Sequence, residues 1–95
     1  MSYEEWVMAR GDPSKELGNI YNVLALAGEA GELANYAKKQ WAGRGDYTKD
    51  MRLEIGDILY YLIRVCHDLG IDLAEAQRLN MEKITAREAK RMKKL

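Results

Sequence analysis

Four acidic residues with a repeated spacing are the part of this 95-residue sequence best suited to chemistry. Glu29 and Glu32 stand three residues apart, and Glu54 and Asp57 repeat that spacing further along the chain. Residues three apart share one side of a helix, and in both pairs a tyrosine follows seven residues after the first acid. The pattern predicts two helices with matching acidic faces, each beside an apolar stripe.

The two acidic faces meet if the helices fold back on each other about a turn at residues 43–46. Each residue adds about 1.5 Å to a helix, which brings the two pairs within roughly 6 Å in height. Clustered negative charges repel one another unless a proton or a cation offsets them. Oxygen-only ligands select a hard divalent cation, so the four acids predict a Mg²⁺ or Mn²⁺ site. The alternative is a solvated acidic face, because 15 acidic and 15 basic residues produce such spacings by chance.

Cations extend the argument from metal to phosphate. Asn80, Lys83 and Arg87 lie on one predicted helical stripe, and Lys38 and Lys39 lie about two turns beyond the first acid pair. Acids can hold a metal, the metal can hold phosphate oxygens, and cations can offset the remaining phosphate charge. The combination suits a complex of phosphate and metal.

An all-α fold is the arrangement that the composition favours for positioning these residues. Alanine, leucine, glutamate and lysine are plentiful, no β-branched segment alternates with a period of two, and the single proline lies near the start. The length allows one domain, residues 1–95, with a short N-terminal helix and three main helices, and we expect oligomerisation to complete a four-helix-type core. The predicted helices run from Ser2 to about Arg10, from Glu16 or Gly18 to Trp41, after Thr48 to Leu69, and from Asp72 onward.

Caps and apolar stripes refine this interpretation. Ser2 and Asp72 begin capping-box patterns, Thr48 is the expected N-cap of the third helix, and Gly70 is expected to close it. The stripe of the second helix is Ile20, Val23, Ala27, Ala30, Leu33, Ala34, Ala37 and Trp41, and Trp41 is expected in the core or at a subunit interface. The predicted buried face of the third helix is Met51, Ile55, Ile58, Leu59, Leu62, Cys66 and Leu69.

Two glycines inside the second predicted helix need a reason. Gly28 and Gly31 each cost about 1 kcal/mol in a helix relative to alanine. Close approach of a neighbouring helix would explain them, and so would room beside a ligand. Close packing is the interpretation that we favour.

Charge and cysteine content exclude several classes of protein. The formal net charge is zero, which argues against wrapping nucleic acid or an anionic membrane surface. The longest apolar run, residues 58–63, is too short to span a bilayer, and the acidic start lacks a secretory signal. The single cysteine, Cys66, suits a reducing compartment, so we expect a cytoplasmic protein.

Residues 24–33, LALAGEAGEL, and residues 53–62, LEIGDILYYL, resemble the two signature helices of the MazG-like nucleotide pyrophosphohydrolases. The join at residues 70–73 and the stripe of Asn80, Lys83 and Arg87 resemble the closing helix of that family. The resemblance covers about residues 14–88. Residues 1–12 have no strong match, so base contacts by Tyr3 and Trp6 stay open.

This resemblance implies an all-α, Mg²⁺-dependent enzyme that hydrolyses nucleoside or deoxynucleoside triphosphates to the monophosphate and pyrophosphate, for nucleotide pool control or house-cleaning. It implies a homodimer or tetramer with the site near a subunit interface. The metal ligands that it implies are Glu29, Glu32, Glu54 and Asp57. The substrate contacts that it implies are Lys39, Lys83 and Arg87 at phosphate oxygens, and Asn80 and Tyr61 near the nucleotide.

Other catalytic arrangements are missing from the sequence. The turn at residues 43–45 lacks the Gly-Lys-Thr ending of a phosphate-binding loop, and no serine–histidine pair is evident. His67 is interpreted as a surface residue and Cys66 as a core residue. What remains is metal-activated water attacking a phosphoanhydride, with Glu29 or Glu32 accepting the proton. The sequence leaves open which carboxylate acts and whether the α- or β-phosphorus is attacked.

Aromatic residues offer further nucleotide contacts. Tyr36 and Tyr61 lie between the acids on their helices and are the better candidates for stacking on a base. A related all-α pyrophosphohydrolase, of the dUTPase-like or phosphoribosyl-ATP type, is the alternative enzyme. A non-catalytic helical dimerisation module is the alternative from another class.

Overall fold

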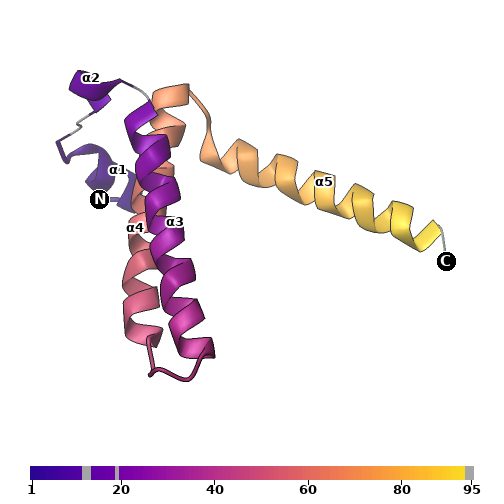
Figure 1. Ribbon diagram of the computed structural model, residues 1–95. Helices are drawn as coiled ribbons and strands as arrows, with labels where there is room; N and C mark the ends of the chain where they lie inside the picture. Colours follow the sequence, from indigo (N-terminus) through magenta and orange to yellow (C-terminus); the bar gives the residue numbers. More distant parts are fainter. Residues whose placement is uncertain (12–13, 19, 94–95) are drawn as a thin grey trace.

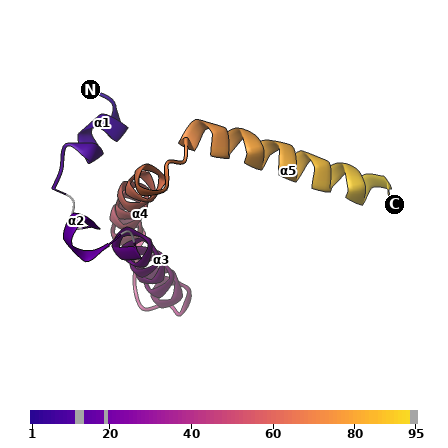
Figure 2. The same ribbon diagram turned by 90° about the horizontal axis from the view of Figure 1, so that it is seen from above.

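The computed structural model of the protein describes residues 1–11, 14–18 and 20–93, and this part of the chain contains helices and no strand. The all-α prediction is confirmed. Helices α3 and α4 run side by side as a hairpin, whereas α5 projects away from it (Figures 1 and 2). The helices are α1 (Tyr3–Met8), α2 (Ser14–Leu17), α3 (Ile20–Trp41), α4 (Thr48–Leu69) and α5 (Leu73–Lys93).

Three helix ends follow the predicted caps. The Ser2 hydroxyl accepts from the Glu5 amide at 3.1 Å, and the Glu5 carboxylate accepts from the Ser2 amide at 3.2 Å, which makes a complete capping box for α1. Asp72 Oδ1 accepts the Ala74 amide at 2.9 Å and starts α5. Gly70, with φ of 65°, closes α4 in the left-handed conformation that glycine tolerates.

Two predicted boundaries were wrong. Tyr47, not Thr48, is the N-cap of α4, and Asp46 Oδ1 accepts the Thr48 amide at 3.0 Å. The short aspartate side chain reaches the backbone two residues on, so it takes the capping role. The single long helix predicted to begin at Glu16 or Gly18 is divided, because Gly18 adopts a φ of 88° that a right-handed helix does not allow.

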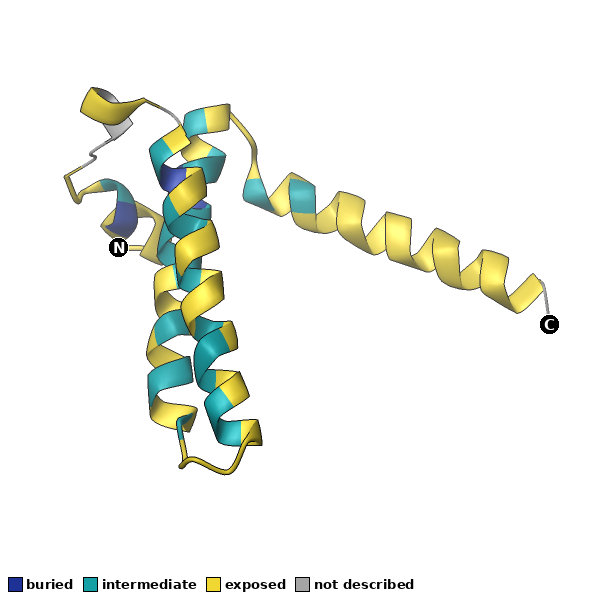
Figure 3. Ribbon diagram, in the orientation of Figure 1, coloured by how far each residue is buried: buried dark blue, intermediate teal, exposed yellow. Residues whose placement is uncertain are grey.

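Of the predicted stripe of α3, Leu33 is half-buried, whereas the other members are exposed. The half-buried side chains of α3 include Leu26, Glu29, Leu33 and Tyr36, about a quarter turn from the stripe centred on the small residues. Trp41 is 92% exposed, so it is no part of a core in this chain. The hairpin therefore pairs through the polar-edged face, and the small-residue stripe stays on the surface, as the yellow of α3 shows (Figure 3).

The seam between α3 and α4 buries few side chains completely. On α4, the predicted Met51, Ile58, Leu62 and Cys66 are half-buried, but Ile55, Leu59 and Leu69 are exposed. A Cβ added at Gly28 or Gly31 would meet no atom within 4 Å in the described chain. Close packing within one chain therefore does not explain these two glycines, contrary to the preferred interpretation.

A buried arginine fastens the N-terminal helix to α4. Arg64 is 1% exposed, and its Nη2 atom donates to the carbonyl oxygens of Val7 at 3.1 Å and Gly11 at 2.9 Å. The same atom lies 3.1 Å from the Tyr60 hydroxyl. Val7 and Ile63 are the buried apolar residues of the described chain. The predicted apolar face of α4 did not include this second buried side.

Helix α5 lies almost entirely in solvent, where Figure 3 draws it yellow beyond its first turns. The radius of gyration of 17.1 Å exceeds the value of about 12 Å expected of a compact chain of this length. Among the described residues, no helix combines the length and apolar character needed to cross a bilayer.

Candidate functional site

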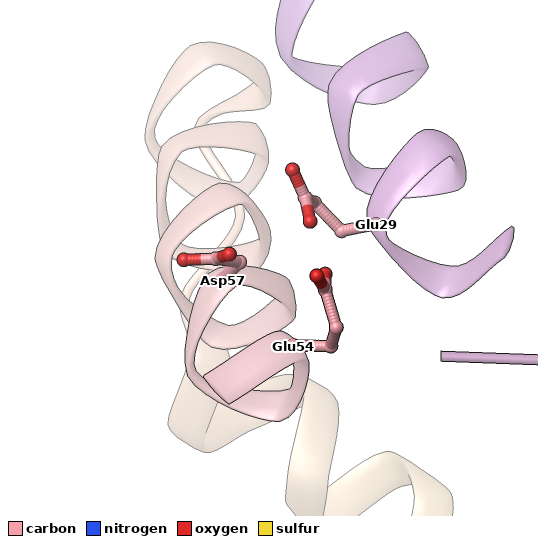
Figure 4. A group of neighbouring side chains, drawn as sticks. All are labelled: Glu29, Glu54 and Asp57. Atoms are coloured by element: carbon pink, nitrogen blue, oxygen red, sulfur yellow. The ribbon is translucent and has the colours of Figure 1, made fainter. Parts of the chain in front are cut away.

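Three of the four predicted acids converge on the α3–α4 seam. Glu29 comes from α3, and Glu54 and Asp57 come from α4. The carboxylates of Glu29 and Glu54 point toward each other, and that of Asp57 lies beside them (Figure 4). One oxygen from each can be chosen so that all three lie within 4.8 Å of one another. Glu29 and Glu54 are half-buried, and Asp57 is exposed, so the group opens to solvent on one side.

Glu54 interacts directly with another acid of this group, Glu29. Hydrogen bonding with Glu29 raises its pKa above the ordinary value of 4.5, and desolvation and the charges of Glu29 and Asp50 add to the increase. Its buried Oε2 atom has no hydrogen-bond partner in the described chain. Two carboxyl groups in contact need a proton or a cation between them, so this orphaned oxygen fits a metal ligand.

Glu32 does not join the three-acid group. Its side chain is exposed on α3, one turn beyond Glu29. The sequence pairs the two glutamates by spacing, but the rotation of α3 about its axis turns only Glu29 to α4. Glu32 stays near enough for its charge to raise the pKa of Tyr36.

An acid that the sequence analysis overlooked lies on the same face. Asp50 is half-buried on α4, one turn before Glu54, and its charge is the largest cause of the raised pKa of Tyr36, followed by burial. The i, i+4 spacing of Asp50 and Glu54 is the signal that would have revealed it. The acids of the seam therefore form a row from Asp57 past Glu54 to Asp50, with Glu29 opposite, and we call this set the acidic row.

Both predicted tyrosines, Tyr36 and Tyr61, lie beside the acidic row. Burial raises the pKa of Tyr61, and the neighbouring Tyr21 and the charge of Glu29 raise it further. The ring of Tyr61 meets that of Tyr60 edge-on, with centroids 5.2 Å apart. Tyr61 is thus a neutral phenol beside the acids, able to donate a hydrogen bond to an anionic ligand.

Lys39 lies near the turn, toward the same end of the hairpin as Asp50. Its ammonium is 5.7 Å from the ring centre of Tyr36 and 5.8 Å from that of Tyr47. The two rings stack on each other with centroids 5.7 Å apart. Of the predicted phosphate-binding cations, Lys39 is therefore the one that lies on the hairpin with the acids.

The three predicted contacts on the last helix lie elsewhere in the single chain. Asn80, Lys83 and Arg87 are all exposed on α5, which points away from the acid-bearing hairpin (Figures 1 and 2). All three residues lie on the last helix, as predicted. Within a single chain, however, they do not come near the acids.

The remaining reactive residues lie apart from the acids. His67 is exposed, as expected, and Cys66 is half-buried. Both line a cavity of about 260 Å³ where Met8 of α1, the end of α4 and Leu73 of α5 meet. Neither Cys66 nor His67 belongs to the acidic row.

Comparison with known proteins identifies the chain's relatives. Residues 17–92 match the MazG nucleotide pyrophosphohydrolase domain. The gene 37 protein of Mycobacterium phage L5 is 32% identical over 82 residues, which cover 81% of this chain and 72% of the phage protein. No solved structure matches the chain. The matched region contains the acidic row, Lys39 and nearly all of α5, and it leaves α1 outside.

Proposed function

Because this chain belongs to the MazG nucleotide pyrophosphohydrolase family, we propose that it hydrolyses nucleoside or deoxynucleoside triphosphates to the monophosphate and pyrophosphate. The observations that support this most strongly are that carboxylate oxygens of Glu29, Glu54 and Asp57 lie within 4.8 Å of one another, and that a buried Glu54 oxygen has no hydrogen-bond partner in the described chain. Such a group can hold a divalent cation, which a triphosphate substrate needs. A role in nucleotide pool control or house-cleaning follows from that chemistry.

The proposed metal is Mg²⁺, with Mn²⁺ as a substitute, held by Glu29, Glu54 and Asp57 and supported by Glu32. All of these donors are carboxylate oxygens, and hard oxygen ligands suit these ions. When bound, the ion supplies Lewis-acid polarisation of phosphate and makes water a better nucleophile. A bound ion would also offset the repulsion between Glu54 and Glu29, which adds to the effect of their hydrogen bond and of burial in raising the pKa of Glu54.

Glu32 is our candidate for the group that accepts a proton from the attacking water. It lies outside the three-acid group, so it is not one of the three closest ligands of the proposed metal. An exposed carboxylate one turn from Glu29 can accept a hydrogen bond from water near these acids. Tyr61 stays protonated beside Glu29 and can donate to a phosphate oxygen.

Helix α5 completes the site from a second copy of the chain in our proposal. Lys83 and Arg87 would then contact phosphate oxygens and Asn80 would lie near the nucleotide of the neighbouring subunit. In support, the exposed surface of 7497 Å² exceeds by about 1900 Å² the roughly 5600 Å² expected of a compact chain of this mass. An excess of this size suits a subunit interface in a homodimer or tetramer.

The decisive experiment is an assay of pyrophosphate release from each common ribonucleotide and deoxynucleotide, with Mg²⁺, with Mn²⁺ and with a chelator. We expect metal-dependent release from at least one nucleotide, with the monophosphate as the other product. A dUTPase-like or phosphoribosyl-ATP specialist would act on its own substrate alone. Absence of turnover on every nucleotide, together with no change of Tm on adding Mg²⁺, would leave a non-catalytic dimerisation module.

A further inference from the structure

We propose that the rings of Tyr36 and Tyr47 hold the Lys39 ammonium in position to receive the far end of the substrate's phosphate chain. Tyr47 is then a positioning residue that acts through Lys39. This inference rests on the proposed function and deepens it, because it assigns the end of the acidic row nearest the turn to the phosphates farthest from the metal.

Three contacts define the arrangement. The Lys39 ammonium lies within 5.8 Å of both ring centres, within the range in which an aromatic face attracts a cation. The rings are nearly parallel, with an interplanar angle of 29°, and they come from the two sides of the hairpin, Tyr36 from α3 and Tyr47 from the N-cap of α4. A flexible lysine side chain is thus restrained from both sides at once, which lowers the entropy that it loses on binding an anion.

The charge of Lys39 is available to a ligand. It forms no ion pair with any described acid, although Asp50 and Glu54 act on the neighbouring Tyr36. The side chain is half-buried, so it meets less competition from solvent than a surface lysine. A restrained ammonium without a carboxylate partner suits a phosphate oxygen.

The two tyrosines lie toward the turn from the acids. Tyr36 stands seven residues after Glu29 on α3, and Tyr47, the N-cap of α4, stands seven residues before Glu54. Seven residues correspond to about 10 Å along a helix. Because Lys39 lies within 5.8 Å of both ring centres, it also lies toward the turn, where the charges of Asp50 and Glu54 act on Tyr36.

Tyr47 is itself held by the turn. Its amide donates to Gln40 Oε1 at 2.7 Å, which ties the start of α4 to the end of α3. A Cβ at Gly45 would contact the Tyr47 ring at 3.5 Å, so the turn packs closely beneath it. The ring position is thus set by the hairpin rather than by the ligand.

The test measures binding of inorganic tripolyphosphate with Mg²⁺ by calorimetry, and nucleotide turnover in parallel. Replacing Lys39→Met should weaken tripolyphosphate binding by about ten- to a hundredfold. Replacing Tyr47→Leu should weaken it by about three- to tenfold, while Tyr47→Phe, which keeps the aromatic face, should stay within about twofold of the wild type. Lys49→Met, which removes an exposed lysine near the same turn, is the matched control and should change little.

A double-mutant cycle separates positioning from a general structural role. If Tyr47 acts through Lys39, Tyr47→Leu should have almost no further effect in a Lys39→Met background. Additive losses, or a Tyr47→Phe variant as weak as Tyr47→Leu, would overturn the proposal. If Tyr47→Leu does not fold, Tyr36→Leu supplies the same cycle. If the wild type turns over no nucleotide but the double-mutant cycle still shows coupling in tripolyphosphate binding, the proposed function is refuted and this inference is supported.

Discussion

The α3–α4 hairpin and helix α5 solve the problem of stability in opposite ways. The hairpin joins its helices through a half-buried seam, a hydrogen-bonded turn and an aromatic stack, and this packing orients its acids. Helix α5 has similar length, yet its side-chain ion pair in the described chain, Arg78 with Glu82, is local and solvent-exposed. An isolated helix gains little from such pairs. The difference indicates that α5 needs a partner surface that the hairpin does not.

The largest effect should come from Glu54→Gln in the hairpin. We expect turnover to fall at least about a hundredfold, because a metal ligand is lost. Without metal, the variant should be at least as stable as the wild type, since one repelling charge is gone. Pyrophosphate release and thermal melts with and without Mg²⁺ measure both effects. Glu88→Gln on exposed α5 is the control, and near-native activity of Glu54→Gln would remove Glu54 from the metal site.

The next effect should come from Arg87→Ala on α5, with a loss of about ten- to a hundredfold in kcat/KM. Removing a phosphate contact should leave Mg²⁺ binding to the free enzyme unchanged or slightly tighter, because a positive charge has been deleted. Steady-state kinetics and Mg²⁺ calorimetry test the two halves of this expectation. Unchanged kinetics would make Arg87 an ordinary surface residue.

Mixed assemblies sharpen the comparison between hairpin and α5. Glu54→Gln chains and Lys83→Met/Arg87→Ala chains should each be inactive alone. If α5 serves the neighbouring subunit, a random mixture regains roughly a quarter of the wild-type sites, because half of the dimers then contain one intact site. A mixture as inactive as its components would mean that α5 serves its own chain. Light scattering should first show a dimer or a larger assembly at micromolar concentration, and a monomer would contradict the partner role.

A smaller effect is expected where α1 joins the hairpin. Replacing Arg64→Met keeps the aliphatic stem but leaves the Val7 and Gly11 carbonyl oxygens without this donor. The free energy of unfolding should fall by about 1–3 kcal/mol, and Arg64→Lys should restore only part of it. Urea denaturation followed by tryptophan fluorescence measures the change. Arg52→Met, on the exposed side of α4, should have little effect.

The pH dependence of stability gives a further test of the acid group. The raised pKa of Glu54 means that folding favours its protonated form, so its stabilising contribution is present below pH 4.5 and is lost as the pH rises through the folded pKa. In metal-free protein, the Tm of the wild type relative to Glu54→Gln should therefore fall as the pH rises through that window. Mg²⁺ should reduce the fall. A pH-independent difference would mean that Glu54 does not contact Glu29.

The smallest effect should be on α5 itself. Glu82→Gln removes the ion pair with Arg78, whose side chains are 57% and 61% exposed. Such an i, i+4 pair contributes no more than about 0.5 kcal/mol, so chemical denaturation should show almost no change. A clearly larger loss would mean that this part of α5 is already packed against another surface.

Local patterns made much of this molecule predictable from sequence. The capping boxes at Ser2 and the cap at Asp72 depend on neighbours within three residues, and so does the left-handed Gly70. The acids Glu29, Glu54 and Asp57 could be assigned to facing helices because spacing and a turn determine height along a hairpin. The match to the MazG family, which is also found from sequence, covers residues 17–92.

Rotation about the helix axes was decided only by the tertiary structure. A small-residue stripe and a polar-edged seam both have helical period, and the sequence alone does not say which one meets α4 and which one stays exposed. That choice left Glu32 and Trp41 outside the seam and brought Asp50 and Tyr47 into it. The direction of α5 could likewise not be predicted from local patterns. A helix with few contacts in its own chain is oriented by whatever surface it packs against. Spacing along the chain thus determined which residues share a height, and packing between helices decided which of them share a site.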